Sequence, residues 1–211
     1  MSFPRYPKYK KSGVEWLGNV PEGWELLPLR WYGRCSSGES ISSEEVSLVS
    51  SETQTNPVIG GNGLMGYCDK FNVNNPVLVV GRVGALCGNV HYVQGPAWIT
   101  DNALILIVNQ SVFYHGYLVE LLRTRNLNDI ASKTAQPLIT GTQLRDQRLP
   151  CPKLSEQQSI ANLLDRDTAR IDALIEKVQS AIDKLKEYRT ALISAAVTGK
   201  IDVRKEVKDA L

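Results

Sequence analysis

The chain has 211 residues, a length that suits one globular domain of ordinary size with an appended segment. Its 24 Lys and Arg residues nearly balance 22 Asp and Glu residues, which leaves a net charge of +2. No global positive field therefore marks the chain as a binder of nucleic acid or anionic membranes. Any such partner must be bound by a local patch.

The cysteines and the N-terminus exclude further classes. Cys35, Cys68, Cys87 and Cys151 form no C-x-x-C pair, and the chain has only two histidines. This spacing argues against a zinc site. The N-terminus lacks the apolar region of a signal peptide, and no apolar run approaches the ~20 residues that span a bilayer. We expect a soluble, cytoplasmic protein with reduced thiols and no membrane partner.

Residues 1–152 have the pattern of a β-rich domain. Short apolar runs at 76–84, 87–93 and 103–108 alternate with Gly, Pro and Asn, as in strands joined by tight turns. One helical pattern, at 111–126, is expected to pack on the sheet. We expect the four tryptophans to occupy core or domain-seam positions and not to stack on bases. They are Trp16, Trp24, Trp31 and Trp98.

A long helix is predicted after Pro152. Residues 155–197 contain neither Gly nor Pro, Ser155 and Glu156 suit a cap and a first-turn acid, and Gly199 follows as a stop. At ~1.5 Å per residue, such a helix is about 65 Å long. The predicted fold class is therefore α+β, with a β-rich globular domain followed by one long C-terminal coiled-coil helix.

We divide the chain into the β-rich domain, a helix at 153–198 and a tail at 199–211. Apolar residues of the helix recur at alternating spacings of three and four, as in a coiled coil. This stripe is too long for its own domain to cover, so a second chain is expected to pair with it. A helix folded back on its own domain is the alternative. The expected pairing residues are Leu164, Ile171, Leu174, Ile175, Val178, Ile182, Leu185, Tyr188 and Leu192.

The stretch VIGGNGLMGYCDKFN, residues 58–72, contains a G-x-G-x-x-G spacing formed by Gly61, Gly63 and Gly66. A dinucleotide loop of this kind needs a following helix and an acid about 20 residues further on. Asn-Asn-Pro at 74–76 would break the helix, and the acid is missing. The sequence instead predicts a hairpin turn at Asn62-Gly63 with a returning strand at 67–71.

The sequence contains no complete catalytic motif of the common kinds. Gly199-Lys200 resembles the end of a P-loop, but Ser194 replaces its first glycine and Ile201 replaces its Ser or Thr. The chain has no H-E-x-x-H, no G-x-S-x-G and no N-P-P-Y sequence. The sequence therefore predicts no catalytic residues and no metal site.

Several stretches together resemble the specificity (S) subunits of Type I restriction-modification systems. They are YPKYKKSGVEWLGNVPEGWE at the start, VIGGNGLMGY, VLVVGRVGALCGNV and ITDNALIL in the middle, and residues 149–203 at the end. In that last stretch the family has a proline-containing segment, then E-Q, then a long helix with an I-D-x-L-I sequence. The matching residues here are Glu156, Gln157, Ile171, Asp172, Leu174 and Ile175.

The resemblance implies a non-catalytic subunit that recognises double-stranded DNA and positions methyltransferase (M) and restriction (R) subunits. S-adenosylmethionine, ATP and Mg²⁺ would then belong to those partners, and this chain would need no cofactor. Family members have two target-recognition domains and two long helices, whereas this sequence has one of each. It therefore resembles a half-length subunit, although an expression fragment is an alternative.

Two paired copies would form a homodimer that reads two inverted half-sites separated by an unread gap. Two hypotheses from other classes compete with this one. The first is a coiled-coil assembly adaptor whose β-rich domain binds only protein. The second is an enzyme whose site has no recognised motif.

Three surfaces are candidates for reading DNA, which needs hydrogen-bonding groups at base edges and cations at phosphates. They are the glycine-rich turn, where missing side chains at Gly61 and Gly63 would let backbone approach the duplex, the loop at 33–43 and the segment at 131–148. Each surface has a structural alternative. The glycine-rich turn could serve only to close a hairpin, the loop at 33–43 could be a solvated surface loop, and Thr140 in the third segment could cap a short helix. The candidate DNA-binding residues are Arg34, Ser36, Ser37, Asn62, Lys70, Arg82, Lys133, Gln136, Thr140, Gln143 and Arg145.

Arg82 stands between glycines in an apolar run. It must either reach a strand end that faces DNA or be paired, because burial of an unpaired charge is too costly. A salt bridge to Asp69 or Asp101 is the structural alternative. Arg145 has a similar alternative in Asp146 or Asp101.

Overall fold

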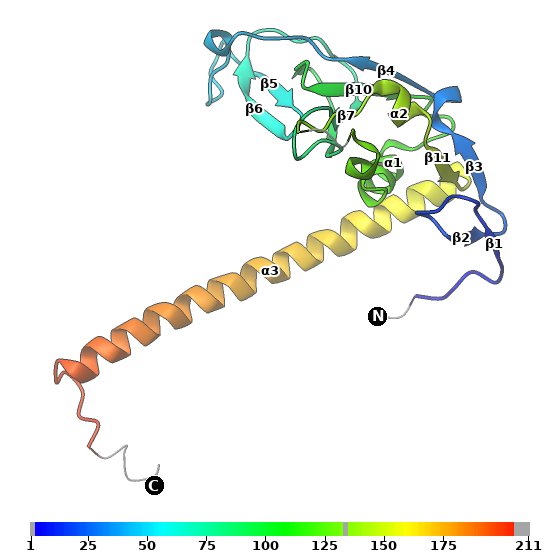
Figure 1. The fold of residues 1–211 in the computed structure, drawn as a ribbon. Helices are drawn as coiled ribbons and strands as arrows, with labels where there is room; N and C mark the ends of the chain where they lie inside the picture. Colours follow the sequence, from blue (N-terminus) through cyan, green and yellow to red (C-terminus); the bar gives the residue numbers. More distant parts are fainter. Residues whose placement is uncertain (1–2, 133–134, 205–211) are drawn as a thin grey trace. The chain divides into compact units, whose positions relative to one another are not determined.

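A four-stranded antiparallel sheet lies at the centre of the β-rich domain in the computed structural model, which describes residues 3–132 and 135–204 (Figure 1). Its strand order is β4-β10-β7-β8, with β4 at Gly33–Ser37, β10 at Ala103–Val108, β7 at Val77–Gly81 and β8 at Val90–Val93. The three apolar runs each contain one of these strands. The sequence-based prediction of a β-rich domain is therefore confirmed.

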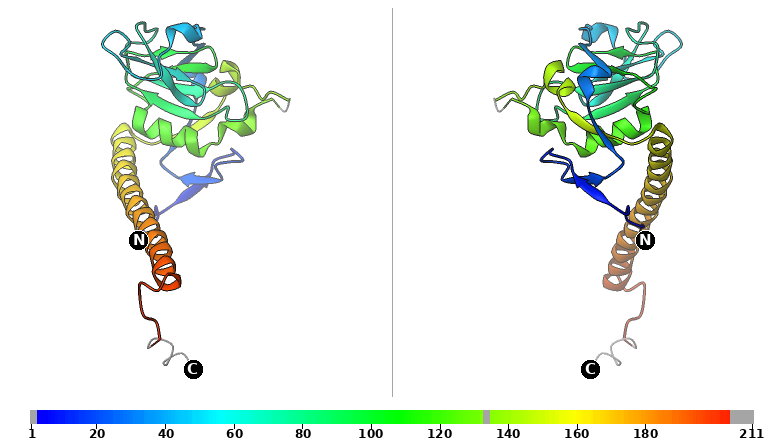
Figure 2. Two further views of the ribbon diagram at one scale, coloured as in Figure 1. Left: turned by 90° about the vertical axis from the view of Figure 1, so that its left-hand side faces the viewer. Right: turned by 90° about the vertical axis from the view of Figure 1, so that its right-hand side faces the viewer.

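Both faces of this sheet are buried, because its strands alternate between two apolar clusters. Leu104 and Leu106 of β10 point into a cluster that includes Leu118 and Leu122 of helix α1 (His115–Thr124). The predicted packing of this helical segment on the sheet is therefore confirmed. Ile105 points the other way, into a cluster with residues of a second, smaller sheet. The result is three layers, with α1 and the small sheet on opposite sides of the central one (Figure 2).

The small sheet has the order β6-β5-β9, with β5 at Asn56–Gly60, β6 at Gly63–Cys68 and β9 at Trp98–Ile99. The predicted hairpin is confirmed, but its two-residue turn is Gly61-Asn62, between the paired residues Gly60 and Gly63, and not Asn62-Gly63 as expected. The returning strand begins earlier than predicted and ends at Cys68. It does so because pairing resumes directly after the turn and β5 offers no partner beyond Asn56.

Two two-stranded sheets and several short helical segments complete this domain. They are β1 (Tyr9–Lys11) with β2 (Asn19–Pro21), β3 (Glu25–Pro28) with β11 (Arg148–Cys151), and η1 (Leu29–Trp31), η2 (Ser43–Glu45), η3 (Leu127–Ile130) and α2 (Gly141–Arg145). The N-terminal segment is anchored to Glu156. The Tyr6 hydroxyl donates to Glu156 Oε1 at 2.7 Å and Trp24 Nε1 donates to the same oxygen at 3.1 Å.

One of the four tryptophans departs from the predicted core position. Trp16, Trp24 and Trp98 are partly buried, whereas the Trp31 side chain is 72% exposed. The Arg30 guanidinium lies 5.8 Å from the Trp31 ring centroid and so covers one face of the ring in place of the core. The sequence-based prediction for Trp31 is wrong, because apolar character alone does not determine on which side of a short 3-10 turn a side chain lies.

The long helix α3 runs from Leu154 to Val197, so the predicted long helix is confirmed, and it begins before the expected cap residue Ser155. Ser155 therefore lies inside the first turn instead of capping it. The helix ends as predicted before Gly199, whose φ of +69° lets Lys200 N–H donate to the Ala195 carbonyl at 2.8 Å.

The chain divides into two compact units, Met1–Ala161 and Asn162–Leu211. In the second unit every residue of α3 from Thr168 to Ser194 is exposed, including the apolar stripe. No helix among the described residues combines the length and apolar character needed to cross a membrane. The observed architecture is the α+β arrangement expected from the sequence.

Gln157 connects the first turn of α3 with the start of α1. Its side chain is fully buried. Oε1 accepts from Tyr114 N–H at 2.8 Å, and Nε2 donates to the carbonyl oxygens of Val112 at 2.8 Å and Pro152 at 2.9 Å. One amide thus satisfies three buried backbone groups, which explains why Gln suits this position in the E-Q pair.

Gln157→Ala should lower the free energy of unfolding by about 2–4 kcal/mol, because it leaves these backbone groups unpaired and opens a cavity. Urea denaturation followed by tryptophan fluorescence measures this change. Gln158→Ala, at the exposed neighbouring position, is the matched control and should change stability by less than about 0.5 kcal/mol. Equal losses of stability in both variants would show that the Gln157 amide does not stabilise the contact between the start of α3 and the start of α1.

Candidate nucleic-acid interface

Four chain segments meet where β7 ends and β10 begins. Arg82 N–H donates to the Asn102 carbonyl at 2.9 Å, and Gly38 N–H donates to the Ala103 carbonyl at 3.1 Å. The Arg82 guanidinium donates from Nη1 to Ser37 Oγ at 3.1 Å. These bonds fix the end of β4, the end of β7 and the turn before β10 together.

The glycine-rich turn is the fourth segment, and its backbone packs directly on the end of β7. A Cβ on Gly81 would lie 2.4 Å from the Gly61 carbonyl oxygen, and a Cβ on Gly61 would lie 2.8 Å from the Asn102 carbonyl oxygen. Gly63, with φ of +103°, faces the His91 ring. The idea that Gly61 and Gly63 leave room for a duplex is therefore wrong, since their missing side chains leave room for the protein itself.

This packing places Asn62 close to the Arg82 region. Asn62 is exposed, and its Oδ1 accepts from Asn89 Nδ2 at 2.9 Å. Asn89 in turn accepts from Gly81 N–H through its backbone carbonyl at 2.8 Å. The structure thus brings Asn62, Arg82 and Ser37 into one region, although they are separated by up to 45 positions in the sequence. Asn89 carries no sequence signal that would identify it as the partner of Asn62.

Arg82 has no carboxylate partner among the described residues. Neither Asp69 nor Asp101 forms a salt bridge with it, so the predicted alternative of a strand-tying ion pair is not found. Its Nε is buried and has no hydrogen-bond partner in the described part of the chain. The charge of this guanidinium therefore remains available to an external anion.

The segment before α2 is joined to the residues that follow β7. Ile139 N–H donates to the Arg82 carbonyl at 2.9 Å, and Gly84 N–H donates to the Pro137 carbonyl at 3.0 Å. Gln136 is exposed beside this contact. Lys133 lies outside the described residues.

Thr140 and Gln143 form a capping box at the start of α2. Thr140 Oγ1 accepts from Gln143 N–H at 3.2 Å, Gln143 Oε1 accepts from Thr140 N–H at 2.8 Å, and Gln143 Nε2 donates to the Ile130 carbonyl at 2.8 Å. The capping alternative for Thr140 is therefore confirmed. The polar groups of both side chains are therefore engaged in hydrogen bonds within the protein. These are the same groups that would be needed to contact a base edge.

Helix α2 lies along β4 on the face that carries Cys35, and it brings Arg145 near that thiol. Gly141 packs against Cys35, where a Cβ would be 3.2 Å from Sγ. Arg145 Nε donates to the Gly141 carbonyl at 3.4 Å, and no salt bridge to Asp146 or Asp101 is found in the described residues. Asp146 instead pairs with Arg30 at 3.3 Å. Arg34 and Ser36 pair with Ile107 and Ile105 of β10, and so they lie on the opposite face of β4 from Cys35 and α2.

The Cys35 thiol lies between β4 and α2, and its environment favours the protonated form. Burial raises the pKa of Cys35 to about 11, and the nearby Arg145 guanidinium only partly opposes this effect. No group of three or more His, Cys, Asp or Glu side chains that could hold a metal ion occurs in the described ranges. The chemistry of this surface is hydrogen bonding and charge.

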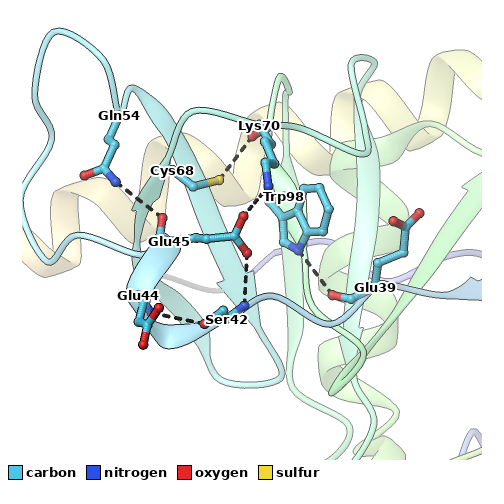
Figure 3. Close-up of polar contacts among 8 residues, drawn as sticks. All are labelled: Glu39, Ser42, Glu44, Glu45, Gln54, Cys68, Lys70 and Trp98. Carbon is cyan, nitrogen blue, oxygen red and sulfur yellow. Dashed lines mark hydrogen bonds and ion pairs between the residues drawn. The ribbon is translucent and has the colours of Figure 1, made fainter.

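Lys70 lies apart from this surface. Asn62 precedes β6 and Lys70 follows it, so about 20 Å of strand separates them. Lys70 forms an ion pair with Glu45 (Figure 3), and the hydrogen bond between them raises the pKa of Lys70 and lowers that of Glu45. The structure thus brings together Ser37, Asn62 and Arg82, with Gln136 on the segment bonded to the residues after β7, but it does not bring Lys70 to them.

Comparison with known proteins gives one family. The family model described as "Type I restriction modification DNA specificity domain" matches residues 32–184. The specificity subunit of the Type I restriction enzyme EcoprrI of Escherichia coli is 31% identical over 168 residues, which cover 80% of this chain and 40% of that protein.

Solved structures give the same fold. A chain from a structure of a type I R-M system aligns with a TM-score of 0.69 at 20% identity, over 89% of this chain and 48% of that one. The S subunit of a Type I restriction-modification system from M. genitalium aligns with a TM-score of 0.61 at 19% identity, over 81% of this chain and 46% of that one. The chain thus spans somewhat under half the length of these proteins.

Gly81→Ala should destabilise the domain by about 1–3 kcal/mol, because the new methyl group would overlap the Gly61 carbonyl and force the two sheets apart. Gly23→Ala is the matched control, since a Cβ there meets no atom within 4 Å. Thermal unfolding of both variants measures the difference. If the two unfold at the same temperature, the close packing of Gly61 on Gly81 is not required.

Proposed function

The chain belongs to the family of Type I restriction-modification DNA specificity domains, and on this basis we propose that it is a sequence-specific double-stranded DNA recognition subunit. It reads one half of a split site and positions methyltransferase and restriction subunits on the DNA. The chain itself contributes no catalytic group. S-adenosylmethionine, ATP and Mg²⁺ are bound by those partner subunits.

The observation that carries this proposal is an arginine without an acid partner where β4 and β7 end. Arg82 donates to Ser37 beside the glycine-rich turn that carries Asn62, and it forms no salt bridge within the described ranges. Several other arginines of the described chain are paired with Asp or Glu. Free guanidinium groups suit phosphate oxygens and the O6 and N7 acceptors of guanine.

Neutral side chains on the same surface supply the second requirement of a sequence reader. Asn62 suits the N6 and N7 groups of adenine, and the Ser37 hydroxyl, which is bonded to Arg82, adds a further polar group. We assign Thr140 and Gln143 a positioning role, because their polar groups form the capping box. Lys70 lies outside the proposed interface, because Glu45 neutralises it.

The exposed stripe of α3 supports pairing of two copies. Its residues from Ile171 to Leu192 are each between 41% and 67% exposed in the single chain, which is costly for so many large apolar side chains. Two antiparallel copies would bury the stripe and carry one DNA-reading domain at each end. The dimer would then read two inverted half-sites separated by a gap whose length the helices set.

Arg82→Ala should lower affinity for the specific duplex about 5- to 150-fold, as expected for a loss of about 1–3 kcal/mol per arginine contact. Mapping of methylated adenines after co-expression with the neighbouring methyltransferase gives the site, and fluorescence anisotropy with that duplex measures affinity at several salt concentrations. Arg204→Ala, where the arginine pairs with Asp202, is the control and should bind normally. Salt-independent binding, or an unaffected Arg82→Ala variant, would argue for a protein-binding adaptor instead.

Leu174→Lys with Leu185→Lys should convert the dimer into a monomer, because two charges would face an apolar seam. Light scattering measures the mass. The control is Ser180→Lys with Thr190→Lys, which adds the same charge on the outer face of the helix and should leave twice the chain mass. A stripe variant that remains dimeric would exclude pairing through α3.

A further inference from the structure

Consecutive residues of the glycine-rich turn lie over one face of β7 and β8. A Cβ on Gly81 would lie 2.4 Å from the Gly61 carbonyl oxygen, and a Cβ on Gly63 would lie 3.3 Å from Cε1 of His91. Gly81 N–H donates to the Asn89 carbonyl at 2.8 Å, which continues the antiparallel register of these two strands. Residues directly opposite each other share a face of a sheet, as do alternate residues of one strand. Asn89 therefore lies on the face that the turn covers, opposite Gly81 and two residues before His91.

The Asn89 side chain bonds the residue between the two glycines of the turn. Its Nδ2 donates to Asn62 Oδ1 at 2.9 Å. Asn62 is exposed and Asn89 is partly exposed, so the amide pair lies at the surface. Asn62 Nδ2 and Asn89 Oδ1 have no hydrogen-bond partner among the residues that the structure describes. Because an amide carries its donors and its acceptor on opposite sides, this bond leaves Nδ2 of Asn62 as the free donor.

The bond between the two amides contributes more to the direction of the Asn62 amide than to stability. An exposed hydrogen bond between two neutral amides adds little to stability, because water replaces either partner at small cost. The turn is already held by the close backbone packing of Gly61 on Gly81. The Asn89 amide therefore determines which polar group of Asn62 is presented to a ligand.

The direction of the Asn62 amide matters because the four bases present different groups in the major groove. Guanine presents the acceptors N7 and O6, whereas cytosine presents only the N4 donor. A free Nδ2 donor is matched by the acceptors of guanine, by N7 of adenine and by O4 of thymine, but not by cytosine. Adenine is matched twice, because Asn62 Oδ1 keeps a second lone pair for the N6 donor.

We propose that Asn89 is a specificity-determining residue that acts through Asn62. It orients the Asn62 amide so that the turn accepts a base with a major-groove acceptor and rejects cytosine. The inference rests on the proposed function, under which Asn62 contacts a base edge. Asn89 itself is a positioning residue, and it sets the identity of the contacted base without touching that base.

The first measurement locates the base that Asn62 contacts. Fluorescence anisotropy with the full-length chain gives the affinity for duplexes in which each base pair of the specific site is varied in turn. Asn62→Ala should lose discrimination at one position of the half-site, which marks the contacted base. At that position the wild-type chain should bind the guanine duplex at least about fivefold more tightly than the cytosine duplex.

The second measurement reverses the amide. In Asn89→Asp the carboxylate can only accept, so the Asn62 amide must turn to donate from Nδ2 and then presents Oδ1. The ratio of guanine affinity to cytosine affinity should invert, to at least about fivefold in favour of cytosine. Repulsion between the added charge and phosphate leaves this ratio unchanged, because it acts equally on both duplexes.

Two further variants serve as controls for this inversion. Asn62→Asp places an acceptor on the turn with the same added charge, and it should invert the ratio in the same way. Asn89→Leu removes the amide at similar side-chain size, so the Asn62 amide turns freely and the ratio should approach one.

An Asn89→Asp variant with the wild-type ratio would overturn the inference. An equal loss of affinity for both duplexes would also overturn it, since a merely structural role of Asn89 predicts that result. The same holds for an Asn62→Ala variant that keeps its discrimination at every position, which would leave the role of Arg82 intact. A wild-type chain without any sequence preference contradicts the proposed function itself, so the two failures are distinguishable.

Discussion

The contact between the backbones of Gly61 and Gly81 is the constraint on which the candidate interface depends. It holds the turn of the small sheet against the end of β7, and any Cβ on Gly81 would lie 2.4 Å from a carbonyl oxygen. Asn62 and Arg82 are next to these glycines, so their side chains emerge from adjacent backbones. The glycine spacing that resembles a dinucleotide loop thus serves protein packing and places two polar side chains together.

The regular elements could be predicted from the sequence because their signals are local. The apolar runs at 76–84 and 103–108 are strands, and the uninterrupted pattern at 155–197 is a helix. Trp31 shows the limit of this reasoning, since its apolar ring is exposed and covered only by Arg30. Local pattern reveals which residues are apolar but not which of them the tertiary structure covers.

The candidate interface was only partly predictable for a related reason. The sequence around Lys70 gives no sign of an acidic partner. In the structure, Lys70 pairs with Glu45, which lies 25 positions away. The partner of Asn62 is Asn89, at a distance of 27 positions. No periodicity connects such residues. The role of Thr140, in contrast, was accessible as an alternative, because a capping box spans only three positions.

The hairpin β5–β6 has different electrostatic character at its two ends. Its turn lies beside Arg82, which has no acid partner in the described residues, whereas Asp69 and Glu44 of η2 lie near its open end about 20 Å away, where Glu45 is paired with Lys70. A polyanion some distance from the molecule would attract one end and repel the other, and so would exert a torque on it before contact. Collisions would then occur preferentially with the turn foremost, which restricts the orientational search during encounter.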